Sequence, residues 1–257
     1  MLQRILLKPE EEVGLEFFTS CRSDPHHLGS VKMRFGAYIG VPATFIYTSA
    51  DEVDRDHLRI PQYTIDWTSD VGQALLNAIV LSDKAKEFAI AREINYAATY
   101  HLHIDTIMRC GFGILAYVSG SMLNGIFQLS RRLKVWARAG VFSFVAVTSG
   151  FLYLLASDAY FCWRDNSIDR KTAQLSQFYA EGGVEFYNKM LERNQALRTV
   201  LGARGPSLYT LYGNNVSTWR QPHTQISARR NKLIKHLEAY SKTEPEPKIS
   251  GGGQETM

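Results

Sequence analysis

Two long stretches without charged side chains, residues 110–129 and 139–157, constrain this chain more than any other feature. About 20 helical residues cross the roughly 30 Å hydrocarbon core of a bilayer, and a helix satisfies its own backbone N–H and C=O groups there. The stretches therefore predict a helical hairpin that crosses a membrane twice. The alternative is a pair of buried helices in a soluble protein, since the first stretch contains several Ser, Asn and Gln residues and is only moderately apolar.

The segment that joins the two stretches, residues 130–138, is basic and contains no Asp or Glu. Trp136 within it suits a membrane interface, and basic loops stay on the negative side of a membrane. We therefore expect this loop on the matrix or cytoplasmic side, and both flanking regions together on the opposite side. The basic residues of the loop are Arg131, Arg132, Lys134 and Arg138.

The composition of the whole chain is that of a folded protein largely surrounded by water. Of its 257 residues, 45% are apolar and 21% are charged, which excludes a polytopic transporter and indicates a membrane-tethered domain. The net charge of +4 does not mark a nucleic-acid binder, because much of the excess lies in the hairpin loop. We expect an α+β membrane protein: a two-span helical hairpin with a small β-containing, mostly helical domain built from both flanks, and the lipid bilayer as a partner.

The three cysteines, Cys21, Cys110 and Cys162, match no zinc-binding pattern. Cys110 and Cys162 flank the outer ends of the hairpin, so they could form a disulfide in an oxidising compartment or remain unpaired. No copper-binding pattern is visible, and we predict no cofactor. The acidic residues 10–12 argue against a signal peptide or a mitochondrial presequence at the N-terminus.

Residues 1–109 are predicted to form a β-bearing and helical soluble region ahead of the hairpin at residues 110–157. Residues 31–49 and 62–67 are rich in β-branched and aromatic side chains and contain Gly and Pro breaks, so they predict short strands. Residues 21–30, after a weakly patterned start, are typical of a loop.

Helix start signals follow these strands. Ser69 and Ser82, each followed by Asp, are N-cap signals for helices over residues 70–80 and from residue 84 onward. The second of these helices should lead almost directly into the first span.

Residues 158–240 are predicted to form a helical soluble region after the hairpin. Helices are expected over residues 165–179 and 184–200, with Gly182 and its neighbouring glycine as the break between them. Gly202 should end the second helix in a left-handed backbone conformation.

A basic amphipathic segment follows at residues 227–240, and it predicts either a solvated helix or a helix on a membrane surface. The second interpretation would make the chain a membrane-anchored lipid-binding module. Residues 241–257 are rich in Gly, Pro and charged residues, a composition typical of disorder.

Several phrases of the sequence stand out by their order and separation over roughly residues 40–216. They are GVPATF at 40–45, YTIDW at 63–67, LSDKAKEFAIARE at 81–93, IDRKTAQLS at 168–176, GGVEFY at 182–187, NQALRTVLG at 194–202, LYT at 208–210 and GN at 213–214. In these phrases the chain resembles the transmembrane protein 177 family. This resemblance implies a protein of the mitochondrial inner membrane that associates with newly made cytochrome c oxidase subunit 2 and with the assembly chaperone of that subunit, and that stabilises this module without catalysis. It implies no residue-level partner site.

A weaker similarity connects the layout of the chain with membrane zinc metallopeptidases. In those enzymes an H-E-x-x-H helix before the hairpin supplies two zinc-binding imidazoles and a general base, and an E-x-x-x-D segment after it supplies a carboxylate. Here Arg92, Glu93 and Tyr96 occupy the H-E-x-x-H positions, and Asp165 and Asp169 occupy the E-x-x-x-D positions. An Arg has no lone pair for zinc and a neutral Tyr is a poor ligand.

Two interpretations of these five residues remain open. Arg92 could take the place of the metal and pair with Glu93, Asp165 or Asp169 in a buried ionic cluster, or the helix could simply expose its charges to water. The resemblance to the transmembrane protein 177 family implies a non-enzymatic assembly factor, and the alternative is a membrane metallopeptidase-like enzyme with an unusual site.

Overall fold

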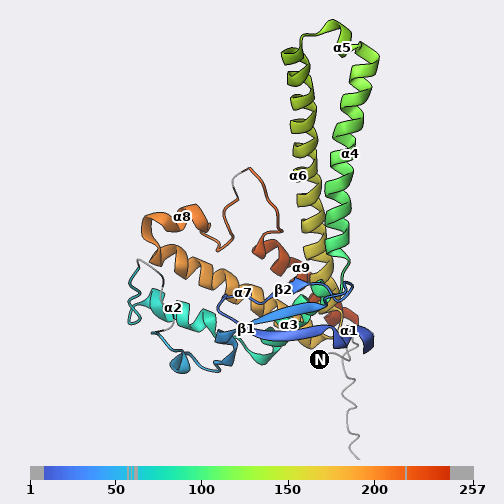
Figure 1. Ribbon diagram of the computed structural model, residues 1–257. Helices are drawn as coiled ribbons and strands as arrows, with labels where there is room; N and C mark the ends of the chain where they lie inside the picture. The colour runs from blue at the N-terminus through green and yellow to red at the C-terminus, as the bar shows by residue number, and fades with distance from the viewer. Residues whose placement is uncertain (1–8, 57, 59, 61–62, 218, 244–257) are drawn as a thin grey trace, which may run out of the picture.

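Two long helices stand side by side on a domain of shorter helices and one small sheet (Figure 1). The computed structural model describes residues 9–243, apart from 57, 59, 61, 62 and 218. The long helices are α4 (His101–Phe127) and α6 (Val135–Ala173), and the short α5 (Leu129–Arg132) lies between them. The described chain is thus mostly helical, as the sequence predicts, and the domain is built from segments on both sides of the hairpin.

The outer surfaces of α4 and α6 are apolar and are left uncovered by the rest of the described chain. In the most apolar window of each helix, only 6% of the residues are buried. A continuous apolar surface of this kind is unfavourable in water, and both helices are long enough to cross a bilayer. The alternative of two helices buried inside a soluble domain is therefore wrong.

Helix α6 continues through the predicted end of the second span. Residues 139–157 form its uncharged part, and residues 158–173 extend from the membrane into the domain. The predicted helix over 165–179 is wrong in its bounds, because its first half belongs to α6. The next helix, α7, begins at Gln177.

Helix α7 (Gln177–Val200) contains Gly182 and Gly183 in its interior, so the prediction that this pair separates two helices is wrong. A Cβ atom on Gly182 would lie 2.2 Å from the carbonyl oxygen of Lys84 on the neighbouring helix. The pair therefore permits close helix packing instead of a turn. Gly202 has a φ of +52°, the left-handed conformation expected where the helix ends.

A three-stranded sheet covers one side of the domain in the order β1-β3-β2. Strands β1 (Leu15–Ser20) and β3 (Ala37–Pro42) are parallel, and β2 (His26–Gly29) is antiparallel to β3. The prediction of a loop over residues 21–30 is therefore wrong for His26–Gly29, which form β2. The strand predicted at 62–67 is also wrong. Tyr63 makes a single β-bridge to Ile60, and residues 64–67 are not in a strand. Gln62 lies outside the described residues.

The predicted helix starts at Ser69 and Ser82 are confirmed. The Ser69 hydroxyl accepts a hydrogen bond from the Gly72 backbone N–H at the start of α2 (Asp70–Ile79). The Ser82 hydroxyl accepts one from the Ala85 N–H at the start of α3 (Asp83–Ala97). The remaining elements are α1 (Pro9–Val13), η2 (Ala43–Ile46), η3 (Ala50–Glu52), η4 (Gly202–Arg204), α8 (Gly205–Leu208) and α9 (Ile226–Thr243).

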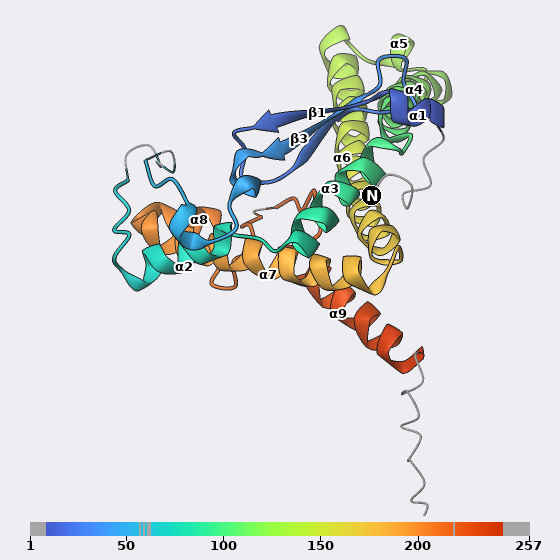
Figure 2. The ribbon, with the colours of Figure 1, turned by 90° about the horizontal axis from the view of Figure 1, so that it is seen from below.

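Helix α3 lies at the centre of the domain, between the sheet and α7 (Figure 2). Its side chains Phe88 and Ile94 are fully buried, and they share the core with Phe186 and Tyr187 of α7 and Ile39 of β3. The second half of this helix, residues 91–97, is buried on every side, so even its polar residues lie inside the domain. This burial sets the environment of Arg92, Glu93 and Tyr96.

All three cysteines are free thiols in the part of the chain that the structure describes. Cys110 and Cys162 are therefore unpaired in the structure and do not form the disulfide that was the other alternative. Cys110 is exposed on the hairpin surface.

Candidate functional site

The structure brings together the five residues that the metallopeptidase layout singles out. Helix α3 supplies Arg92, Glu93 and Tyr96, and the part of α6 below the membrane span supplies Asp165 and Asp169. All five are buried, with exposed fractions between 2% for Asp165 and 8% for Arg92. The alternative of a surface helix with its charges in water is therefore wrong.

On the α3 side, Arg92 and Glu93 form a buried ion pair. The Arg92 Nε and Nη2 atoms lie 3.0 and 2.5 Å from Glu93 Oε1. His27 of β2 lies on the other oxygen, with its Nδ1 atom 2.7 Å from Glu93 Oε2. Both oxygens of the Glu93 carboxylate are thus engaged by groups of the chain itself.

On the α6 side, Arg229 of α9 binds Asp169 through two parallel hydrogen bonds, from Nε to Oδ2 at 2.6 Å and from Nη2 to Oδ1 at 2.7 Å. The same guanidinium approaches Asp165, with Nη1 3.9 Å from Oδ2. The Tyr96 hydroxyl donates to Asp165 Oδ1, and His223 Nδ1 lies 3.0 Å from Asp165 Oδ2. Fork-to-carboxylate pairing of this kind is the strongest form of side-chain ion pair.

Tyr187 of α7 connects the two sides. Its hydroxyl accepts a hydrogen bond from Arg92 Nη1 at 3.1 Å and donates one to Asp169 Oδ1 at 2.7 Å. Arg92 thus reaches Asp169 only through Tyr187 in the described contacts, and its direct ion-pair partner is Glu93. The prediction that Arg92 itself takes the metal's place between the carboxylates needs correction, because Arg229 lies there.

Four residues that contact the five buried ones were not visible in the sequence as site residues, and one of them, His223, is itself exposed. We call these nine residues together the buried network. Arg229 lies three residues after Ile226 and four before Leu233, both buried, so it is on the inward face of α9. This spacing is the one sequence feature that could have identified Arg229 as a site residue. The others come from strands, loops and helices far away in the chain, where no local pattern marks them. The four are His27, Tyr187, His223 and Arg229.

The surroundings keep the carboxylates charged and the tyrosines protonated. Burial opposes the charge of Glu93, but Arg92 and His27 outweigh it and leave the pKa of Glu93 below its ordinary value. Burial likewise opposes the charge of Asp165, which lies outside the membrane span, yet His223, Arg229 and Tyr96 lower its pKa to about 2. Burial also raises the pKa of Tyr96 and of Tyr187 above the ordinary tyrosine value, so both act as hydrogen-bond donors.

This buried network does not fit a catalytic zinc ion. Two guanidinium groups lie among its carboxylates, and the H-E-x-x-H positions supply no imidazole. Within the described residues, no group of three or more His, Cys, Asp or Glu side chains could hold a metal ion. What the network does is join α3, α6, α7, α9 and β2 by charge-assisted hydrogen bonds, as expected of a structural element.

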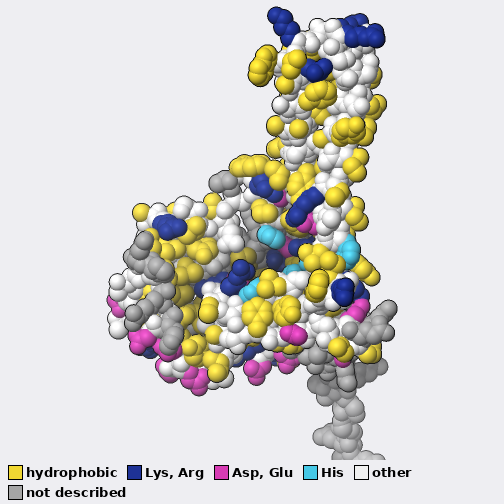
Figure 3. Space-filling model, viewed as in Figure 1, with side chains coloured by type: hydrophobic (Ala, Val, Ile, Leu, Met, Phe, Trp, Pro, Cys, Tyr) yellow, Lys and Arg dark blue, Asp and Glu magenta, His cyan; other side chains and the backbone are white. Residues whose placement is uncertain are grey.

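The basic loop lies at the opposite end of the molecule from this network. Figure 3 shows Lys and Arg side chains gathered at the tip of the hairpin, where α5 and the start of α6 meet. The Trp136 side chain is 88% exposed there, so it can lie at the interface between membrane and water. The basic residues at this end are Arg131, Arg132 and Lys134, which are exposed, and Arg138, which is partly buried.

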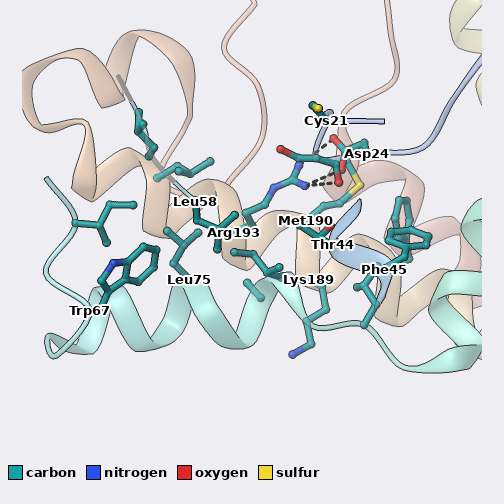
Figure 4. Close-up of a pocket in the computed structure, with 18 residues that line it drawn as sticks. Cys21, Asp24, Thr44, Phe45, Leu58, Trp67, Leu75, Lys189, Met190 and Arg193 are labelled. Carbon is teal, nitrogen blue, oxygen red and sulfur yellow. Dashed lines mark hydrogen bonds and ion pairs between the residues drawn. The ribbon is translucent and has the colours of Figure 1, made fainter. Parts of the chain in front are cut away.

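A separate pocket of about 240 Å³ lies between α2, α7 and the segment that precedes α2 (Figure 4). Its wall is mostly apolar and includes Trp67, Leu75 and Met190. Arg193 and Asp24 lie at one side of the pocket and form an ion pair with N···O distances of 2.7 and 2.9 Å.

Comparisons with known proteins identify related sequences. The family model described as Transmembrane protein 177 matches residues 19–239 of the chain. Transmembrane protein 177 from Homo sapiens is 34% identical over 224 residues, which is 84% of this chain and 70% of that protein. The protein of the same name from Xenopus laevis is 38% identical over 186 residues, 70% of this chain and 58% of that protein. No solved structure matches. The chain therefore belongs to the transmembrane protein 177 family.

Proposed function

We propose that this chain is a non-enzymatic assembly factor of the mitochondrial inner membrane. It stabilises the assembly chaperone of cytochrome c oxidase subunit 2 and so supports the biogenesis of that subunit. Membership of the transmembrane protein 177 family and the two membrane-capable helices support the membrane part of this proposal. The role in oxidase assembly is the one that the family resemblance implies.

The observation that carries the non-enzymatic part is the position of Arg229. Its guanidinium forms two hydrogen bonds with Asp169 and lies 3.9 Å from Asp165, the two carboxylates that the metallopeptidase layout would offer to zinc. A buried cation and a zinc dication cannot share this space without strong repulsion. The alternative of a membrane metallopeptidase therefore finds no support in the geometry of the buried network.

The basic hairpin loop supports one orientation. Four cationic side chains and no acid occupy residues 130–138, and by the positive-inside rule such a loop stays on the matrix side. The domain that carries the buried network, the pocket and the sheet then lies in the intermembrane space. A scaffold in this position can bind a partner on the side opposite to the matrix.

The proposal predicts a specific loss when the protein is removed. In cells without this chain, we expect less of the subunit 2 chaperone and faster decay of newly made subunit 2 in a pulse-chase experiment, with other newly made mitochondrial subunits unchanged. A tagged full chain should restore both and co-purify with both in mild detergent. Unchanged chaperone and subunit 2 after removal of the chain would contradict the assembly role.

A further inference from the structure

The connection between α8 and α9 places an exposed indole beside the hairpin. This connection rises along the lower part of α6 (Figure 1). Trp219 within it is 68% exposed and stacks on Phe151, with ring centroids 6.5 Å apart and an angle of 14° between the ring planes. Phe151 belongs to the uncharged part of α6, so Trp219 touches a residue of the membrane span.

The charged groups nearby define the level of this contact along the hairpin. Asp158 is the first charged residue after the uncharged stretch of α6, and it lies seven positions after Phe151, a rise of about 10 Å along the helix. On the other helix, Arg109 pairs with Asp105 and its Nε donates to the Tyr153 hydroxyl at 3.2 Å. The boundary between charged and apolar surface therefore passes close to the stacked rings.

Arg220, the next residue after Trp219, holds the connection at this boundary. Its Nε and Nη2 atoms donate to the Asp158 carboxylate at 3.0 and 2.6 Å. Its guanidinium also lies over the Trp219 ring, 5.7 Å from the ring centroid. The tryptophan thus faces the apolar surface of the span, while the arginine remains at the charged level.

Trp219 also extends an apolar strip that a bilayer must cover. The strip follows one face of α6, at spacings of three and four residues, and its members are all largely exposed in the described structure. Figure 3 shows hydrophobic side chains continuing from the hairpin onto the adjoining part of the domain. The members on α6 are Phe144 at 72%, Val147 at 72%, Phe151 at 48% and Leu155 at 48% exposure.

We propose that Trp219 is a third membrane contact of this protein, inserted at the boundary between headgroups and acyl chains of the leaflet nearest the domain. Tryptophan favours this zone because its ring is apolar and its indole N–H can bind interfacial water or lipid oxygens. The continuity of the strip with the two spans identifies lipid as the occupant of this surface. The contact fixes the domain against the membrane.

Fluorescence quenching in liposomes tests this contact. We would reconstitute the full chain with Trp67, Trp136 and Trp163 replaced by Phe, so that only Trp219 emits. We expect blue-shifted emission and strong quenching by lipids brominated near the headgroup end of the acyl chain, with weak quenching by aqueous iodide. A chain that keeps only Trp67, in the pocket wall of the domain, should show little quenching by the brominated lipids.

Two further variants keep the test decisive if the triple replacement disturbs folding. Trp219→Phe in the otherwise native chain should remove part of the emission that brominated lipids quench. Arg220→Ala should reduce the quenching of Trp219, because it releases the connection from Asp158. Emission typical of a water-exposed indole, or an indole that brominated lipids do not reach, would overturn the proposal.

Discussion

Replacing Arg229 with methionine is expected to lower the free energy of unfolding by about 3 to 5 kcal/mol. The side chain is 11% exposed and satisfies both oxygens of Asp169, which is itself buried. Methionine fills a similar volume but leaves Asp165 and Asp169 close together without their shared cation. Equilibrium unfolding of the purified chain in detergent micelles measures the change.

A neighbouring arginine provides the matched control. Arg230 lies on the same helix, but its hydrogen bonds go to the neutral side chains of Asn231 and Asn188. Arg230→Met should therefore change the free energy of unfolding by no more than about 1 kcal/mol. Adding Asp169→Asn to Arg229→Met should recover part of the loss, because it removes the unpaired charge. Equal effects at positions 229 and 230 would contradict the account of a buried ionic network.

Gly182→Ala should have the second largest effect, about 3 kcal/mol of lost stability, at the upper end of the usual cost of overpacking. The new Cβ atom would lie 2.2 Å from the carbonyl oxygen and 2.6 Å from the carbonyl carbon of Lys84, both backbone atoms of α3. Helices α3 and α7 would have to separate, and the contact between Phe88 and Phe186 would loosen. The gain in helix propensity from Gly to Ala, about 1 kcal/mol, is too small to offset this clash.

Gly150 on α6 provides the control for the glycine effect. A Cβ atom there would meet no atom of the described structure within 4 Å. Gly150→Ala should leave thermal unfolding of the domain unchanged or slightly raise its midpoint. A Gly182→Ala chain as stable as the native one would show that close packing is not the reason for this glycine.

The sequence predicted well those features that depend on local patterns. The uncharged stretches at 110–129 and 139–157 mark the hairpin because each is about as long as a helix that crosses a bilayer, and soluble helices rarely lack charge over such a length. Ser69 and Ser82 mark helix starts because a cap acts within three residues. The spacing of Arg92 and Tyr96 placed both on one side of α3.

Features that depend on tertiary contacts were predicted less well. The partners of the buried carboxylates are distant in sequence: Arg229 lies 60 residues from Asp169, and His27 lies 66 residues from Glu93. From the local sequence alone, Gly182 predicts a turn. In the structure a glycine is needed at this position because the backbone of Lys84 on α3 leaves no room for a side chain. Strand β2 begins with two adjacent histidines, which carry no alternating apolar pattern.

Zinc analysis of the purified full-length chain tests the central claim most directly. The account predicts that protein isolated from zinc-supplemented cells contains no stoichiometric zinc, because Arg229 and Arg92 already neutralise the buried carboxylates. One zinc ion per chain, lost on replacing Asp165 and Asp169 with Asn, would contradict the account and favour the metallopeptidase alternative.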